Sequence, residues 1–153
     1  MKKVLLALVL LASATLFAQT PFDGTWMTKL DTAKFPTKPD KYSLNNNMYE
    51  CLTCVPKVAV KADGTDQKVT GHPYFDTITV QVVNASSVEI TQKKDGKVMY
   101  KDNATVSTDG KTLTDKFTDT TGTQPVTGEV TSTRVSAGPA GSHALSGRGA
   151  RRR

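Results

Sequence analysis

Apolar and polar residues alternate over most of residues 22–135, and this alternation restricts the fold more than any other feature. In the stretch DTITVQVVN, Ile78, Val80 and Val82 fall on one face, and polar residues fall on the other. A period of two is typical of a half-buried β-strand. Threonine contributes 23 residues, and its branched Cβ suits a pleated surface. No segment has a helical period, so the pattern predicts an all-β domain.

Asp-Gly pairs interrupt this alternation at four places, beginning at Asp23, Asp63, Asp95 and Asp109. Asp-Gly supplies the positive φ angles that two-residue hairpin turns require. We therefore expect an antiparallel up-and-down meander, with residues 30–43 as a Pro- and Lys-bearing connection. The expected strands lie near residues 24–30, 46–52, 56–62, 66–70, 76–83, 87–94, 97–106, 111–119 and 126–135. So many strands in a short chain must close into a barrel or form a sandwich, because open edges invite aggregation.

The first residues read as a secretory signal. Lys2 and Lys3 precede an unbroken apolar run of nine residues, Val4 to Ala12. Such a run is too short to span a bilayer, and small residues suggest cleavage after Ala14 or Ala18. We expect a signal peptide over 1–18, a β-barrel domain over 19–135 and a disordered tail over 136–153. The protein should then be exported, either periplasmic or secreted, with no transmembrane segment.

The net charge of +6 does not describe the domain. Residues 19–135 hold 13 Lys and one Arg against 14 Asp and Glu, so the excess lies in the two ends of the chain. Nucleic-acid binding rests on clustered positive charge. The neutral body therefore argues against nucleic acid as its partner.

Both cysteines, Cys51 and Cys54, lie in YECLTCVP. An exported chain favours a local disulfide, which would contribute about 2 kcal/mol on the chain-entropy estimate. A redox-active pair would need a low-pKa thiolate, usually at a helix start, and a metal site would need two more ligands. A free dithiol is the fourth interpretation. We expect the disulfide and leave the other three open.

No other residues assemble into a catalytic set. His72 precedes a proline and is expected to be an ordinary loop histidine. Asp115 shares the face of Leu113 and Phe117, so it would either orient a ligand inside a barrel or turn to water at a strand end or bulge. We favour the strand end or bulge. The sequence thus predicts no enzyme, no catalytic residue, no cofactor and no metal.

The opening FDGTWMTKL resembles the first strand of lipocalins, through Gly24-x-Trp26. In that superfamily the Trp plugs one end of a barrel, and an Arg from the last strand lies across its ring. The resemblance implies a contact between Trp26 and Arg134, the one arginine between signal and tail. Such a cation–π contact contributes roughly 0.5–2 kcal/mol. The blocks KADGTDQKVTGHPYFDTITVQVV, EITQKKDGKVMY and TVSTDGKTLTDKF extend the resemblance, over roughly residues 22–147, to exported bacterial lipocalin-like proteins without an established activity.

In that group the chain continues into a second lipocalin-like unit after a join similar to GPAGSHALSG. There the join is followed by Ser-Trp-Arg-Thr-Thr-Lys. Read one nucleotide late, codons for those residues give Arg-Gly-Ala-Arg-Arg-Arg, which is residues 148–153. The resemblance therefore implies that this chain is the first of two units and is truncated by a frameshift. A genuine basic arm is the alternative.

The tail also contains four glycines and Pro139 and has no alternating apolar run. We therefore expect residues 136–153 to be disordered, and truncation after Val135 to change stability by no more than about 0.5 kcal/mol.

Three functions remain open from the sequence. The first is a binding module whose barrel holds a small hydrophobic molecule. The second is a structural or interaction protein of the cell envelope, with a barrel filled by its own side chains. The third is a dithiol redox protein built on Cys51 and Cys54. The sequence does not indicate an oligomeric state.

Overall fold

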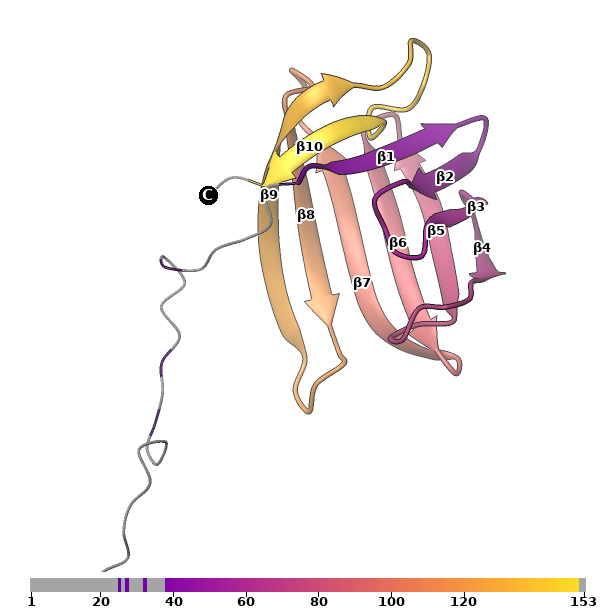
Figure 1. The fold of residues 1–153 in the computed structure, drawn as a ribbon, viewed down its shortest axis with the longest axis vertical. Coiled ribbons are helices and arrows are strands. Elements are labelled where there is room, and N and C mark those ends of the chain that lie inside the picture. The colour runs from indigo at the N-terminus through magenta and orange to yellow at the C-terminus, as the bar shows by residue number, and fades with distance from the viewer. Residues whose placement is uncertain (1–24, 26, 28–31, 33–37, 152–153) are drawn as a thin grey trace, which may run out of the picture. The chain divides into compact units, whose positions relative to one another are not determined.

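A single antiparallel sheet of ten strands makes up the described part of the molecule (Figure 1). It is a computed structural model that describes residues 25, 27, 32 and 38–151. The strands are β1 (Asp40–Asn45), β2 (Met48–Cys51), β3 (Val58–Lys61), β4 (Asp63–Lys68), β5 (Thr77–Asn84), β6 (Ser87–Lys94), β7 (Lys97–Val106), β8 (Thr112–Asp119), β9 (Val126–Ala137) and β10 (Gly147–Arg151). The chain divides into two units, Met1–Lys34 and Phe35–Arg153, and these strands belong to the second.

The sheet order is β3-β2-β1-β10-β9-β8-β7-β6-β5-β4, so strands that are adjacent in the sheet are consecutive in sequence, except where β10 meets β1. At that place Gly147 of β10 lies opposite Tyr42 of β1 on one side and Ala137 of β9 on the other. The two ends of the order, β3 and β4, are separated in sequence by Ala62 alone. The sheet thus forms a nearly closed up-and-down barrel, which confirms the predicted all-β antiparallel fold.

Positive φ angles at Asp95 (51°) and Gly96 (78°) make the two-residue turn between β6 and β7. Both strands have the predicted bounds, because alternation and turn chemistry agree there. The Asp-Gly pair at Gly64 behaves differently. Gly64 also has a positive φ, but it lies inside β4 where the register with β5 shifts. It makes an irregularity within a strand and no hairpin.

The first strand of the described residues lies where a connection was predicted. β1 occupies Asp40–Asn45, within and just beyond the Pro- and Lys-bearing stretch. Asn46 and Asn47 turn it into β2, and both take positive φ angles of 47° and 60°. Asn tolerates this left-handed conformation better than most residues. The strand was therefore not predicted because it ends in an Asn-Asn turn and not in an Asp-Gly turn.

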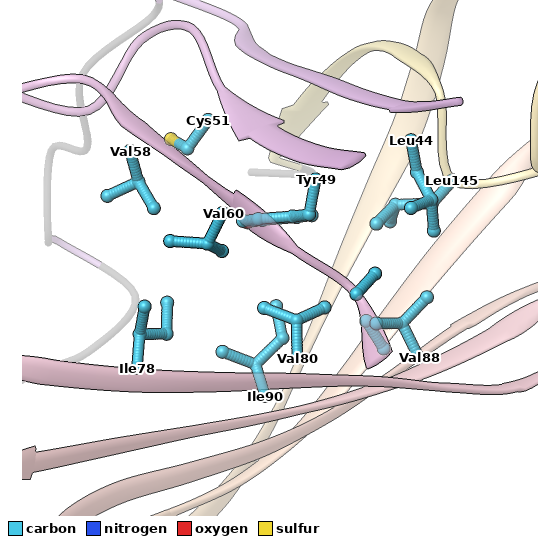
Figure 2. Packing of buried hydrophobic residues seen from close by; sticks show 12 residues of the cluster. Leu44, Tyr49, Cys51, Val58, Val60, Ile78, Val80, Val88, Ile90 and Leu145 are labelled. Atoms are coloured by element: carbon cyan, nitrogen blue, oxygen red, sulfur yellow. The ribbon is translucent and has the colours of Figure 1, made fainter. Parts of the chain in front are cut away.

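Alternating apolar side chains from both ends of the sheet order meet inside the barrel. In Figure 2, Tyr49 and Val60 lie across the core from Val80 and Ile90, which come from β5 and β6. The buried apolar cluster comprises Leu44, Tyr49, Cys51, Val58, Val60, Ala62, Ile78, Val80, Val88, Ile90, Ala104 and Leu145. Burying one such aliphatic side chain contributes about 1.5–3 kcal/mol. The predicted inner face of Ile78, Val80 and Val82 matches this core.

The prediction of a disordered tail over 136–153 is wrong through Arg151. β9 continues to Ala137, and β10 pairs with both β9 and β1. Between them, Leu145 is only 6% exposed and Ser146 only 2% exposed. The composition of the tail offers little apolar surface, but backbone hydrogen bonds and one well-placed leucine order it.

Several expectations fall outside the described residues. The signal peptide over 1–18 is one, and most of the strand expected over 24–30 is another. Trp26 lies outside them as well, so its contact with Arg134 stays a prediction.

Candidate functional site

Asp102 and Asp115 both lie on the inner face of the barrel. In the pairing of β7 with β8, Asp102 is opposite Phe117, and Asp115 is opposite Ala104. Directly opposed residues project to the same side of a sheet, and Ala104 belongs to the buried core. Asp115 also lies opposite Val130 of β9 in an uninterrupted ladder. The favoured interpretation of Asp115 as a strand-end or bulge residue is therefore wrong.

The carboxyl of Asp102 is the more unusual of the two. Its Oδ1 atom is buried and has no hydrogen-bond partner. The pKa of Asp102 is raised from 3.8 to about 7, chiefly by burial and also by the negative charge of Asp115, while a hydrogen bond from the backbone of Asn103 partly opposes the rise. Near neutral pH this group exists both as a proton donor and as an anion.

Tyr100 and Phe117 lie on the same inner face as these carboxyls, because Tyr100 alternates with Asp102 and Phe117 pairs with it. The rings of Tyr42 and Tyr49 stack with centroids 6.2 Å apart, and those of Tyr100 and Phe117 stack at 5.7 Å. Burial raises the pKa of Tyr49 well above its ordinary value, and negative charge on Tyr42, Asp102, Asp115 and Asp40 adds to the rise. Tyr49 is therefore a neutral hydroxyl close to both inner carboxyls.

Sequence reasoning singled out Asp115 but missed Asp102. The signal was present, because Asp102 alternates with Tyr100 and Ala104 in the predicted strand 97–106. A carboxyl at an inward position of a central strand should have been marked with Asp115. What the sequence did not show was that register places both beside Tyr49.

The end of the barrel next to the β9–β10 connection is packed. A cavity of about 20 Å³ remains there, lined by Tyr42, Val106, Leu113, Arg134 and Leu145 together with Gly147 and Gly149. That volume accommodates one water molecule. The side chain of Leu145 therefore helps to fill this part of the interior.

Arg134 holds the connection in place. Its Nε donates to the carbonyl oxygen of Gly110 at 2.5 Å, its Nη1 to Ser146 at 2.7 Å and its Nη2 to Ala144 at 2.5 Å. These bonds tie the β7–β8 turn to the β9–β10 connection. Arg134 thus joins two connections at this end of the barrel through its guanidinium group.

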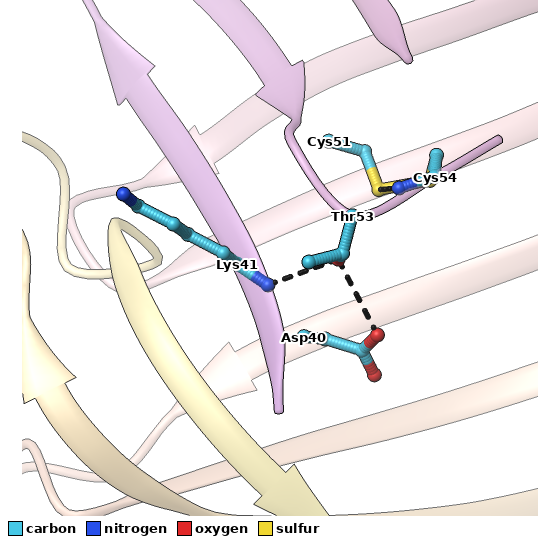
Figure 3. Close-up of a disulfide and its surroundings, with 5 residues drawn as sticks. All are labelled: Asp40, Lys41, Cys51, Thr53 and Cys54. Atoms are coloured by element: carbon cyan, nitrogen blue, oxygen red, sulfur yellow. Dashed lines mark hydrogen bonds between the residues drawn. A yellow bond between two sulfur atoms is a disulfide. The ribbon is translucent and has the colours of Figure 1, made fainter. Parts of the chain in front are cut away.

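Cys51 and Cys54 form a disulfide, as predicted. Cys51, the last residue of β2, is only 3% exposed. Its Sγ accepts a hydrogen bond from the backbone N–H of Cys54 at 3.1 Å. Figure 3 shows Thr53, between them, bound to the strand beside it. Its Oγ1 accepts from the backbone N–H of Lys41 at 3.1 Å. The bridge therefore shapes the turn after β2 and attaches it to β1.

His72 lies between β4 and β5, where its ring stacks on Phe75 with centroids 4.4 Å apart. The described residues contain no group of three or more His, Cys, Asp or Glu side chains arranged to hold a metal ion.

Comparison with protein-family models, curated proteins and solved structures found no match to this chain. In the part of the chain that the structure describes, no helix has the length and apolar character to cross a membrane.

Proposed function

We propose that the chain is an exported, lipocalin-like binding module without catalytic activity, and that its barrel holds a small hydrophobic molecule bearing one polar group. The observation that carries this proposal is the buried Oδ1 of Asp102, which lacks a hydrogen-bond partner. A buried polar atom left unpaired costs about 1–3 kcal/mol. A ligand that pairs with Asp102 would offset that cost.

The neighbouring side chains indicate the ligand class. Tyr100 and Phe117 offer flat apolar surfaces for the body of the molecule. Asp102, with its pKa raised to about 7 by burial, can donate to a carbonyl oxygen or accept from an amine or hydroxyl. An apolar or aromatic compound with one such group fits these partners.

Asp102→Val tests the proposal. The substitution removes the unpaired carboxyl and suits a strand, so the ligand-free protein should become more stable by about 1 kcal/mol, as urea unfolding would show. Native mass spectrometry of protein from its own host should show a bound small molecule in the wild type and none in the variant. Asp109→Asn, in the β7–β8 turn, is the control and should retain the ligand. A wild-type protein without ligand, together with no gain in stability for Asp102→Val, would contradict the proposal.

Asp102 also predicts a pH dependence of stability. Its pKa is about 7 in the folded protein against 3.8 in the unfolded chain, because burial disfavours the anion. The unfolded chain therefore loses this proton first, and its contribution to stability declines as pH rises from about 4 to about 7. Unfolding at several pH values should show this decline in the wild type and not in Asp102→Asn.

The lowered-pKa carboxyls act in the opposite direction and at lower pH. Hydrogen bonds lower the pKa of Asp63, Asp66, Asp76, Asp109 and Asp119. Their contribution is present above about pH 4 and is lost as pH falls through their folded-state values. The wild type and Asp102→Asn share this loss of stability at low pH, so it cancels when the two proteins are compared.

A specific observation favours the alternative of a structural protein with a filled barrel. The cavity beside Leu145 holds about 20 Å³, so that end is filled by the protein's own side chains. If native mass spectrometry shows no ligand while Asp102→Val still stabilises the protein, this alternative is preferred.

Membership of a two-unit lipocalin-like group, and truncation by a frameshift, also remain part of this proposal. Resequencing the gene past codon 147 tests the frameshift. A confirmed reading frame, with no Trp and no second strand-rich unit in the neighbouring frame, would contradict it.

A further inference from the structure

The inner face of β7, β8 and β9 carries a flat apolar surface, at the end of these strands that is remote from the small cavity described above. The rings of Tyr100 and Phe117 stack there at an interplanar angle of 16°. Phe117 lies opposite Gly128 of β9, and a Cβ added to Gly128 would lie 2.5 Å from the Cζ atom of Phe117. The ring of Phe117 therefore lies directly over the backbone of Gly128. We call Tyr100, Phe117 and Gly128 the shelf.

The shelf is open on one side. β10 pairs with residues 132–137 of β9, so within the described residues the first half of β9, residues 126–131, is paired on the β8 side alone. Figure 1 shows the corresponding ends of β7, β8 and β9 extending beyond β1 and β10. Tyr100 and Phe117 are accordingly half-buried. This opening leaves the shelf accessible to a flat molecule without displacement of any of the ten strands.

Asp102 lies directly beside the shelf, between two apolar neighbours. It is opposite Phe117 on β8 and opposite Ile90 on β6. Neither neighbour can pair with a carboxyl, in agreement with the buried and unpartnered Oδ1 of Asp102. Directly opposed residues have Cβ atoms about 4.5–5.5 Å apart, so a group bound to the carboxyl of Asp102 also meets the ring of Phe117.

The lysines next to this place in sequence cannot neutralise Asp102. Lys101 of β7 and Lys116 of β8 alternate with inward residues, so both lie on the outer face, where they are exposed. Lys101 pairs there with Glu89 at 3.1 Å, and Lys116 pairs with Glu129 at 3.8 Å. The outer face of these strands therefore balances its own charges and supplies no positive charge to the inner face.

The charges that act inside this part of the barrel are negative. Asp115 acts on Asp102, and both of these carboxyls act on Tyr49. The other basic side chains of β6–β9 lie elsewhere: Lys93 and Lys94 pair with Asp66 and Asp76, Lys97 is exposed next to the β6–β7 turn, and Arg134 bonds to backbone carbonyls at the opposite end of the barrel. A ligand that brings a positive charge to the shelf would therefore be attracted, whereas an anion would be repelled.

We propose that the ligand of this site is a cation, namely a protonated amine on a flat apolar or aromatic body. This inference rests on the binding function proposed above and narrows it, because that function also allowed a neutral carbonyl or hydroxyl compound. The ammonium group donates to Oδ1 of Asp102, and the body of the molecule covers the shelf. The rings of Phe117 and Tyr100 add to the attraction, since an aromatic ring attracts a cation within about 6 Å of its centroid.

The number of protons released on binding distinguishes an amine from a carbonyl compound. Near pH 7 the carboxyl of Asp102 is partly protonated, because its pKa is about 7. An ammonium pairs with the anion and expels this proton, whereas a carbonyl oxygen accepts from the protonated acid and promotes proton uptake. Calorimetric titration with 2-phenylethylamine in two buffers of different ionisation enthalpy counts the protons. Release at pH 7 is expected, and uptake or no proton exchange would overturn the inference.

Three probes with the same ring test the charge directly: 2-phenylethylamine, the neutral 2-phenylethanol and the anionic 3-phenylpropionate. NMR titration of the full-length protein, refolded from urea to free it of any resident molecule, measures the three affinities. The amine should bind at least about tenfold more tightly than the alcohol, because a hydrogen bond between two charged groups is the stronger, and the anion should bind most weakly. Asp102→Asn preserves the shape of the side chain and should abolish the preference for the amine. Asp109→Asn, in the β7–β8 turn, is the control and should keep it.

An amine that binds no more tightly than the alcohol would overturn the inference, whether both bind equally or neither binds. A preference for the amine that persists in Asp102→Asn would also overturn it, since the charge would then bind elsewhere. Native mass spectrometry and the stability of Asp102→Val test the binding function separately. A resident molecule without a basic group would leave that function standing and would remove the cation alone.

Discussion

The β6–β7 hairpin and strand β10 reach the same sheet by different means. In the hairpin, residues 87–106, two alternating strands flank a two-residue Asp-Gly turn with positive φ at both positions. β10 has the sequence GRGAR, with two glycines and no large apolar residue. It nevertheless pairs along both edges, with β9 and with β1. The local sequence pattern therefore specifies the β6–β7 hairpin, whereas β10 forms because β1 and β9 both offer backbone groups with which it can pair.

The physical reason lies in the backbone. Ladder hydrogen bonds join N–H and C=O groups, which every residue except proline carries. A strand between two partners therefore needs few favourable side chains, provided that its backbone fits. The strands of the β6–β7 hairpin also lie between two partners, but they have in addition their own turn and the buried inner residues Val88, Ile90 and Ala104.

Truncation after Ala137 should have the largest effect on stability of the changes considered. It removes the connection between β9 and β10 together with β10, and it leaves β1 and β9 with unpaired edges. We expect a loss of more than about 5 kcal/mol, which is most of the stability of a typical domain. Circular dichroism and urea unfolding would measure the loss, and a peptide covering residues 138–151 should restore part of it. A truncated protein that unfolds like the wild type would show that β10 contributes nothing.

Gly147→Ala tests whether backbone fit controls β10. Gly147 has a φ of 139°, and an added Cβ would lie 2.4 Å from the carbonyl oxygen of Ser136. We expect a loss of about 2–4 kcal/mol in urea unfolding. Gly149→Ala is the matched control, because its Cβ would meet Ser132 at an ordinary 3.5 Å. Equal effects of the two substitutions would contradict the argument.

The disulfide offers a local constraint of another kind. Replacing Cys51 and Cys54 with Ser should lower stability by about 2 kcal/mol, because the bridge restricts the unfolded chain over a short loop. Thermal unfolding measures this, and ligand binding should be unchanged. Insulin reduction by the wild type that the double variant lacks would instead support the dithiol redox alternative.

Gly96→Ala should have the smallest effect, and it tests how strongly the turn between β6 and β7 depends on glycine. Gly96 has a φ of 78°, but an added Cβ would meet nothing within 4 Å. The expected loss is therefore only backbone strain, about 1 kcal/mol in urea unfolding. A loss as large as that of Gly147→Ala would mean that the turn is as constrained as β10.

The candidate site was only partly accessible from sequence. Alternation around Asp115 marked an inward carboxyl, and the same test would have found Asp102. The sequence could not show that the strand register brings Asp102 and Asp115 near Tyr49, because β2 is far from β7 and β8 in sequence. Nor could it show that His143 and Arg134 hold the connection between β9 and β10 in place, since their partners are backbone carbonyls and amides.

By itself, the sequence determined the all-β class, the central meander from β5 to β9 and the pairing of Cys51 with Cys54. Those features depend on a period of two, on turn residues and on cysteines close together in the chain. Only the tertiary structure decided that residues 138–151 are ordered, that Gly147 lies between Tyr42 and Ala137, and that Leu145 fills the barrel end. These features arise from contacts between distant residues, and backbone groups that every sequence shares make most of them.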